Sequence, residues 1–131
     1  MKEVEFRRAV PNLPVRDARA SIAFFTERLG FKLDWDDAVV GTPKVMYASL
    51  SRGDFQICVD EHASQKAGAA SVWGYVSDVR ALFDEFKAAG AALHKEPEEM
   101  PWGEIELDVR DLDGNGICFT QPAPKNSAEQ A

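Results

Sequence analysis

Polar and hydrophobic residues alternate strictly over residues 104–109, which is the pattern of a strand with one buried face and one exposed face. The buried positions are aliphatic: Ile105, Leu107 and Val109. The exposed positions are all carboxylates: Glu104, Glu106 and Asp108. Residues 111–116 read DLDGNG and supply turn residues, and an extended pattern resumes at Ile117. These residues predict a hairpin with an apolar face and an acidic face, and the same parity places Trp102 beside the carboxylates.

Two other segments carry hydrophobic residues at helical spacing. The first follows Asp17, which is a good N-cap residue, and ends at Gly30. Its buried stripe is Ala18, Ile22, Phe25 and Leu29. The second follows Asp78 and ends at Gly90, and its buried stripe is Val79, Leu82, Phe83 and Phe86. Each segment therefore predicts a helix with one face packed against a sheet.

The remaining ordered segments are predicted to be strands. A first strand lies within residues 1–15, where Pro11 and Pro14 restrict it to an edge or a bulge. A short strand begins over residues 91–94, and an acidic loop follows it as far as Met100. The other predicted strands cover residues 31–35, 44–51, 55–59 and 71–76.

The order of these elements repeats after a shift of 61 residues, so that Asp17 falls on Asp78 and Phe25 on Phe86. Each half reads as a strand, a helix and three strands, which predicts an α+β fold of two tandem βαβββ modules. The first module covers about 9–60, the linker 61–70 and the second module 71–121, within a single domain over 1–121. A disordered tail is predicted for 122–131. One helix covers one face of each sheet, which leaves the other face to line a cleft or to meet another sheet.

Charge and composition narrow the possible partners. The chain has 131 residues and a net charge of −7, and its basic residues are scattered, which argues against nucleic acid or an anionic membrane and favours a cationic ligand. There is no apolar run of a signal peptide or a membrane span, so we expect a soluble, cytoplasmic protein. Cys58 and Cys118 lack CxxC spacing, and we expect two free thiols.

The chain resembles the vicinal-oxygen-chelate superfamily, which includes glyoxalase I, extradiol dioxygenases and bleomycin-resistance proteins. The resemblance covers roughly residues 9–121, and residues 96–119 are most similar to the bleomycin-resistance branch. The motifs that carry it are Pro101-Trp102-Gly103, Asp113-Gly114-Asn115 and Arg28-Leu29-Gly30-Phe31. The resemblance implies mixed, curved sheets with the helices on their convex faces.

Enzymes of this superfamily hold a divalent metal on the concave sheet face, at positions that correspond here to Val10, Ile57, Ser71 and Cys118. The correspondence at Ile57 is determined only to within one residue. None of these four residues is His, Glu or Asp, and one thiol does not make a metal site. We interpret His62 and His94 as surface or packing residues. The sequence therefore predicts no metal, no cofactor and no catalytic residue.

The binding branch implies a homodimer with clefts between its sheets, aromatic side chains that stack on a flat ligand, and carboxylates that attract its positive charge. In that branch an aromatic residue matching Trp35 sandwiches the drug against the residue matching Trp102, and the N-terminal arm before the first strand crosses to the other subunit. The resemblance therefore implies that six residues contact the ligand: Trp35, Trp102, Trp73, Tyr75, Glu104 and Asp108. Packing in the core or at a dimer interface is the alternative role of Trp73 and Tyr75.

The function predicted from the sequence is resistance to a bleomycin-type antibiotic by sequestration, without chemical modification of the drug. Two alternatives remain open. One is a metal-dependent lyase, isomerase or dioxygenase of the same superfamily, and the other is a binding protein for another planar aromatic ligand. Glu104 departs from the resistance pattern, in which a basic residue often follows the Trp-Gly pair.

Overall fold

The structure is a computed structural model that describes residues 2–38 and 44–124. It confirms two βαβββ modules. The first module contains β1 (Asn12–Pro14), α1 (Ala18–Glu27), β2 (Lys32–Asp36), β3 (Tyr47–Arg52) and β4 (Phe55–Asp60). A short 3-10 helix, η1 (Glu61–Lys66), follows it. The second module contains β5 (Ser71–Tyr75), α2 (Val79–Ala88), β6 (Glu98–Glu99), β7 (Glu104–Arg110) and β8 (Gly116–Pro122).

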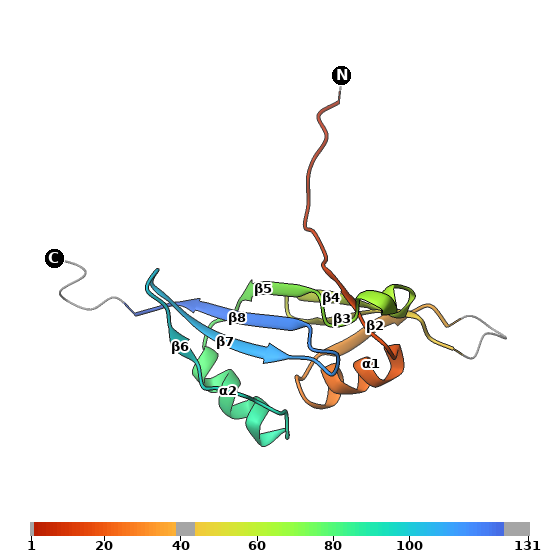
Figure 1. Ribbon diagram of the computed structural model, residues 1–131. Coiled ribbons are helices and arrows are strands. Elements are labelled where there is room, and N and C mark those ends of the chain that lie inside the picture. The colour runs from red at the N-terminus through yellow and green to blue at the C-terminus, as the bar shows by residue number, and fades with distance from the viewer. Residues whose placement is uncertain (1, 39–43, 125–131) are drawn as a thin grey trace.

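The strands form two four-stranded mixed sheets with the same topology, β1-β4-β3-β2 and β5-β8-β7-β6. In each sheet the first and last strands of the module pair in parallel, and the other pairs are antiparallel. Both helices lie on the same side of the sheets, and the N-terminal segment leaves from the opposite side (Figure 1). Each sheet is therefore covered by a helix on one face and is open on the other.

One hydrophobic core lies between the sheets and the helices and includes residues of both modules. Phe119 of β8 links them, because its ring centroid lies 5.1 Å from that of Phe55 in β4 and 5.5 Å from that of Phe86 in α2. Polar contacts join the same parts of the chain: Arg52 donates to both carboxylate oxygens of Glu85, at 2.6 and 2.8 Å. The two modules thus pack as one unit.

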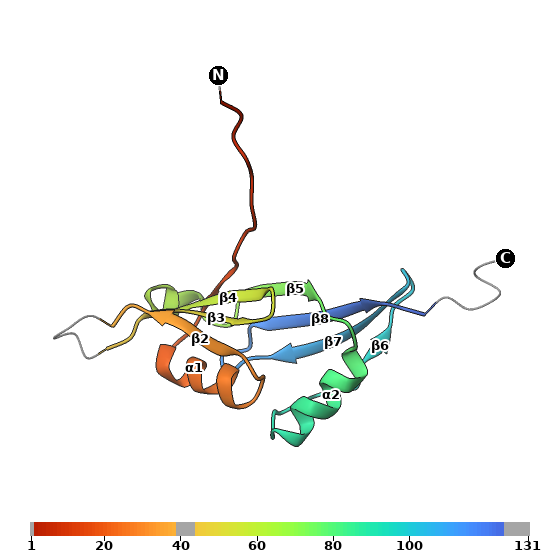
Figure 2. The same ribbon diagram turned by 180° about the vertical axis from the view of Figure 1, so that it is seen from behind.

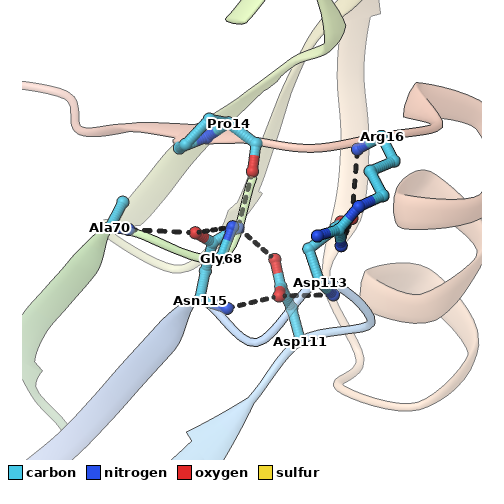
Figure 3. A network of polar contacts seen from close by, with 7 residues as sticks. All are labelled: Pro14, Arg16, Gly68, Ala70, Asp111, Asp113 and Asn115. Atoms are coloured by element: carbon cyan, nitrogen blue, oxygen red, sulfur yellow. Dashed lines mark hydrogen bonds and ion pairs between the residues drawn. The ribbon is translucent and has the colours of Figure 1, made fainter. Parts of the chain in front are cut away.

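A network centred on Asn115 joins three segments that are distant in the sequence (Figure 3). Asn115 is fully buried in the turn between β7 and β8. Its Nδ2 donates to the Pro14 carbonyl at 2.7 Å and to Asp111 Oδ2 at 2.9 Å. Its Oδ1 accepts from the backbone N–H groups of Gly68 at 3.0 Å and Ala70 at 3.1 Å. One side chain therefore connects the end of β1, the segment between the modules and the β7–β8 turn.

The segment between the modules has more structure than its small, polar composition indicates. It begins with η1, and Glu61 at the start of η1 is buried. The Glu61 carboxylate accepts from the Ala18 N–H at the start of α1, at 2.9 Å, and pairs with Lys44 at 2.6 Å. The hydrogen bond from Lys44 lowers the pKa of Glu61. This segment therefore helps to hold α1 in place.

The strands at both ends of the chain differ from the sequence prediction. The alternation of Val4 and Phe6 forms no strand, and β1 covers only Asn12–Pro14, which pair with Cys58, Val59 and Asp60 of β4. At the other end, β8 continues to Pro122, one residue past the predicted boundary, since Pro122 pairs with Glu104. Residues 125–131 of the predicted tail lie outside the described residues.

The predicted short strand at residues 91–94 is wrong, since no strand is present there. The edge strand is β6, Glu98–Glu99, which falls in the predicted acidic loop. Glu98 pairs with Glu106 and Glu99 with Ile105, so β6 exists because β7 offers its edge to this segment. Local pattern contains no signal for that pairing.

Candidate functional site

The open face of the second sheet carries aromatic and acidic side chains, and we call it the acidic face. Strand pairing determines its composition, because residues directly opposite each other share a face: Trp73 lies opposite Cys118, and Cys118 lies opposite Asp108. Its other members follow by alternation along β5 and β7. By the same rule Glu98 of β6, opposite Glu106, and Thr120 of β8, opposite Tyr75, share this side of the sheet. The name acidic face refers below to six residues on this side: Trp73, Tyr75, Cys118, Glu104, Glu106 and Asp108.

Two aromatic side chains of this face are available to a ligand. Trp73 is 51% exposed and Tyr75 is 58% exposed, and their ring centroids are 4.8 Å apart in an edge-to-face arrangement. The Tyr75 hydroxyl donates to Glu104 Oε2 at 3.0 Å, and this hydrogen bond to a carboxylate raises the pKa of Tyr75. An aromatic pair and a carboxylate thus form one connected surface.

The carboxylates of the acidic face differ in their surroundings. Asp108 lies near two basic side chains, with its Oδ2 3.3 Å from His94 Nε2 and 3.1 Å from Arg110 Nη2. Glu104 accepts only the neutral Tyr75 hydroxyl among the described contacts. Among the described residues, the ion pairs of this face involve Asp108, so the negative charge available to a ligand lies at Glu106, beside the neutral Cys118 thiol, and at Glu104, beside the aromatic pair.

Cys118 lies among these carboxylates and is held as a neutral thiol. Burial raises the pKa of Cys118 to about 12, and the negative charge of Glu106 and a hydrogen bond to it contribute next, followed by the charges of Asp108 and Glu104. A thiolate is the reactive form of cysteine. The free thiol of Cys118 is consequently protonated at neutral pH.

We expect Cys118 to react with iodoacetamide at pH 8 roughly a thousandfold more slowly than an unperturbed cysteine. Its pKa of about 12 lies three units above the ordinary thiol pKa of 9.0, so its thiolate fraction is lower by about that factor. Glu106→Gln should accelerate the reaction, since it removes the largest electrostatic contribution. Peptide mass spectrometry of a Cys58→Ala variant measures this rate at a single thiol. A rate equal to that of free cysteine would contradict the prediction.

The open face of the first sheet is less charged and contains a second aromatic pair. Trp35 of β2 is 49% exposed, and its ring centroid lies 5.4 Å from that of Tyr47 in β3. The Tyr47 hydroxyl donates to Asn12 Oδ1 at 3.0 Å, and a hydrogen bond with Cys58 raises the pKa of Tyr47. Trp35 is therefore placed by a strand and supported by a neighbouring ring.

The structure brings together four of the six residues predicted to contact the ligand: Trp73, Tyr75, Glu104 and Asp108. Trp102 is 62% exposed and lies in the turn between β6 and β7, before the strand begins. Strand parity does not extend to Trp102, because Gly103 has a φ of 88° and interrupts the extended run. The prediction that strand parity places Trp102 beside the carboxylates is therefore wrong, although Trp102 is accessible.

Trp35 and Trp102 do not form a sandwich within one chain. The end of β2 and the turn between β6 and β7 lie at opposite ends of the molecule (Figure 1). A ligand held between these two indoles would need a second copy of the chain.

One candidate metal position is wrong in register. Ile57 is fully buried on the helix-covered face, and Cys58 occupies the open face, opposite Asn12 and Ser49. The last strands of the two modules therefore correspond with a shift of 60 residues (118 − 58), one fewer than the shift of 61 that aligns the helix caps Asp17 and Asp78. Within residues 2–38 and 44–124, no three His, Cys, Asp or Glu side chains gather in a way that could hold a metal ion.

Sequence reasoning missed the roles of Tyr47 and Cys58 on the first open face. Tyr47 and Ser49 share the parity of an exposed strand face, which is the signal that could have placed Tyr47 beside Trp35. The position of Cys58 depended on the β3–β4 register, which the sequence does not show.

A hollow of about 1060 Å³ lies where the two modules meet. Its wall includes Trp73 and Tyr75 of the acidic face, Phe55 of β4, and Ala9 and Pro11 at the base of the N-terminal segment. The hollow therefore joins the acidic face to the start of the chain.

None of the helices described is long and apolar enough to cross a membrane.

Two tandem βαβββ modules, each with one covered and one open face, define the class of fold. The sequence profile of the Glyoxalase/Bleomycin resistance protein/Dioxygenase superfamily matches residues 7–119. The chain therefore belongs to that superfamily. No curated protein matches the sequence.

Several solved structures of similar fold are those of bleomycin-binding or bleomycin-resistance proteins. A bleomycin-binding protein from bleomycin-producing Streptomyces verticillus, complexed with copper(II)-bleomycin, is 29% identical, with a TM-score of 0.76 over 94% of this chain and 100% of that chain. A bleomycin resistance determinant encoded on the transposon Tn5 is 27% identical, with a TM-score of 0.74 over 89% and 98%. A bleomycin-binding protein complexed with bleomycin is 27% identical, with a TM-score of 0.72 over 88% and 98%.

Proposed function

We propose that the protein binds a flat, cationic ligand of the bleomycin type and confers resistance by sequestering it without chemical modification. The observation that carries the proposal is the acidic face, where an exposed aromatic pair lies directly beside Glu104 on an open sheet. Similar structures described as bleomycin-binding support the choice of ligand. The two free thiols, Cys58 and Cys118, suit a reducing compartment, and we propose a cytoplasmic location.

The chemistry of the acidic face suits such a ligand. A planar cation over an aromatic ring gains about 0.5 to 2 kcal/mol per favourable contact, and stacking removes additional apolar area from water. Carboxylates attract the ligand and orient its positive charge. Because stoichiometric capture needs no bond to be broken, a binding face without a nucleophile is sufficient.

We further propose that the functional form is a homodimer in which open faces of two copies enclose the ligand. β2, which carries Trp35, and the turn between β6 and β7, which carries Trp102, end at opposite ends of the molecule (Figure 1). This supports the arrangement, because a second copy could place its Trp102 opposite Trp35. Five large hydrophobic side chains of the strands and of the turn between β6 and β7 are also exposed in one copy: Leu33, Trp35, Trp73, Tyr75 and Trp102. Contact with a second copy would cover part of this surface.

Titration of the purified protein with metal-free and copper-loaded bleomycin tests the proposal, with tryptophan fluorescence as the readout. We expect saturable quenching with one site per chain. Trp102→Ala should weaken binding by about 10- to 100-fold, which is the usual cost of removing an exposed aromatic anchor from a binding site.

Leu112→Ala is the matched control, because Leu112 is 60% exposed but lies in the β7–β8 turn. The Leu112→Ala variant should bind bleomycin with the same affinity as the unchanged protein. Absence of any response at tens of micromolar drug would overturn the choice of ligand. Stoichiometric divalent metal in the purified protein would instead favour the metal-dependent enzymes of the superfamily.

A further inference from the structure

Asn115 and Gly116 form the only Asn-Gly pair in the sequence. Asparagine is chemically labile, because the backbone nitrogen of the next residue can attack its side-chain amide carbon. A glycine in the next position has no Cβ atom to hinder that attack. The other two asparagines precede larger residues, Leu13 and Ser127. The chain therefore contains one favourable site for deamidation, and it lies in the turn between β7 and β8.

The reaction needs only water. The Gly116 nitrogen forms a bond to Asn115 Cγ, the bond from Cγ to Nδ2 breaks, and the proton of the attacking nitrogen leaves with the amide group as ammonia. Water then opens the cyclic succinimide at one of its two carbonyl carbons. One opening gives aspartate, and the other gives isoaspartate, in which the main chain runs through the side-chain carbons. One water is consumed and one ammonia is released, without an oxidant or an enzyme.

The folded structure holds both reacting groups in hydrogen bonds that the reaction would break (Figure 3). Asn115 Nδ2, the leaving group, donates to the Pro14 carbonyl at 2.7 Å and to Asp111 Oδ2 at 2.9 Å. The attacking N–H of Gly116 donates to the Ala70 carbonyl at 3.0 Å, and the Ala70 N–H donates to Asn115 Oδ1 at 3.1 Å. Asn115 is also 0% exposed, which excludes solvent from its amide. The site is therefore closed in the folded protein.

Opening this site requires more than a local movement of the turn. The turn between β7 and β8 lies beside α1 in the middle of the molecule, as Figure 1 and Figure 2 show from opposite sides. The Asn115 side chain is bonded to the end of β1 through Pro14 and to the segment between the modules through Gly68, at 3.0 Å. Three segments must separate before the amide is free, so access to it follows the loss of tertiary structure.

The product of the reaction does not fit the folded protein. A carboxylate at position 115 would place an oxygen where Nδ2 now donates to Asp111 Oδ2 and to the Pro14 carbonyl. Asp111 is itself buried, and burial raises its pKa. A second carboxylate beside it would be repelled and would have lost its water. Isoaspartate would in addition lengthen the main chain in a tight turn, so either product removes the network.

We propose that Asn115-Gly116 is a deamidation site that is closed in the folded protein and open in the unfolded chain, and that its modification prevents refolding. The rate in the folded protein then follows the fraction of molecules that are unfolded. The network that joins the modules thereby also determines the lifetime of the protein. This inference does not depend on the proposed ligand, although a ligand that binds only the folded form would slow deamidation by lowering that fraction.

The experiment compares the full chain in guanidinium chloride with the same chain in buffer, at one pH and temperature. Tryptic peptide 111–125 contains Asn115, and chromatography with mass spectrometry separates its asparagine, aspartate and isoaspartate forms. We expect deamidation in buffer to be slower by about 100-fold or more, because a native protein is unfolded to about one part in a thousand or less. Samples of the denatured chain are also diluted into buffer, and circular dichroism measures the refolded fraction. That fraction should fall in parallel with the loss of asparagine.

Gly116→Ala is the matched control. A Cβ atom there makes only ordinary contacts, the nearest at 3.5 Å from Arg110 Nη1, so we expect the variant to fold. Its methyl group hinders the attacking nitrogen. In denaturant, Asn115 of this variant should therefore deamidate several-fold more slowly, and the capacity to refold should last correspondingly longer. Equal loss of refolding in the two chains would assign the loss to other damage and would overturn the proposal.

Three further outcomes would overturn it: no deamidation in denaturant, equal rates in denaturant and in buffer, or a deamidated chain that refolds with unchanged stability. A last comparison separates this inference from the proposed function. At the midpoint of unfolding in urea, bleomycin should slow the deamidation of Asn115 if it binds the folded form. If tens of micromolar bleomycin leave that rate unchanged, the proposed function fails and the deamidation site remains.

Discussion

Replacing Asn115 by alanine should lower the free energy of unfolding by about 3 to 5 kcal/mol, the range of changes that break a buried hydrogen-bond network. The Asn115 side chain makes four hydrogen bonds, to Pro14, Asp111, Gly68 and Ala70, and it is fully buried. Alanine would leave two backbone N–H groups and the Pro14 carbonyl without these partners. Urea unfolding followed by circular dichroism measures the change.

Asp113→Asn is the control for this prediction, because it lies in the same turn and its change is isosteric. Asp113 Oδ1 accepts from the Arg16 N–H at 3.1 Å and pairs with Arg16 Nη1 at 3.0 Å. An asparagine oxygen can keep both hydrogen bonds, so we expect a loss below about 1 kcal/mol, as for other partly exposed ion pairs. Equal losses in the two variants would mean that the turn, and not the Asn115 network, determines stability.

Replacing Gly74 by alanine should destabilise the protein by about 2 to 3 kcal/mol, the usual cost of overpacking a core contact. A Cβ atom at Gly74 would overlap the ring of Phe55, which packs against Phe31 at 5.9 Å and Phe119 at 5.1 Å between centroids. Because Phe55 packs against these two rings, a shift of its ring would disturb the junction of the two modules. Thermal and urea unfolding both measure this loss.

Gly116→Ala provides a matched comparison within the same sheet. A Cβ atom there would lie 3.5 Å from Arg110 Nη1 and 3.6 Å from Ser71 Cβ, which are ordinary contacts. Because alanine lowers the conformational entropy of the unfolded chain, we expect Gly116→Ala to be neutral or to stabilise by up to about 1 kcal/mol. A similar loss at both positions would show that the sheet rejects any added side chain, independent of Phe55.

The Asn115→Ala and Gly74→Ala predictions both test how firmly the two modules are joined. The Asn115 network and the Phe55–Gly74 contact are where the modules meet, and together they determine how the two open faces lie relative to each other. A change at either place can therefore alter binding through the orientation of the sheets. Affinity measurements on the two variants are best interpreted only after their folded fractions are known.

Much of the fold followed from short-range patterns in the chain. The strict alternation over residues 104–109 specified the two faces of β7, and the acidic face contains its three carboxylates as expected. Asp17 and Asp78 cap α1 and α2, each accepting from the N–H three residues later, as their positions indicated. Such features are readable because strand parity and helix capping depend on residues within a few positions of one another.

Other features depended on partners that are distant in the sequence. β6 forms only because β7 offers its edge, and Cys58 rather than Ile57 reaches the open face because β4 pairs with β3 in the register that sets Cys58 opposite Ser49. Trp35 acquires its neighbour Tyr47 only when β2 pairs with β3. Periodicity in a single segment specifies which residues share a face, but it contains no information about which strand lies alongside it or in which register. That choice is made by packing and hydrogen bonding across the whole chain.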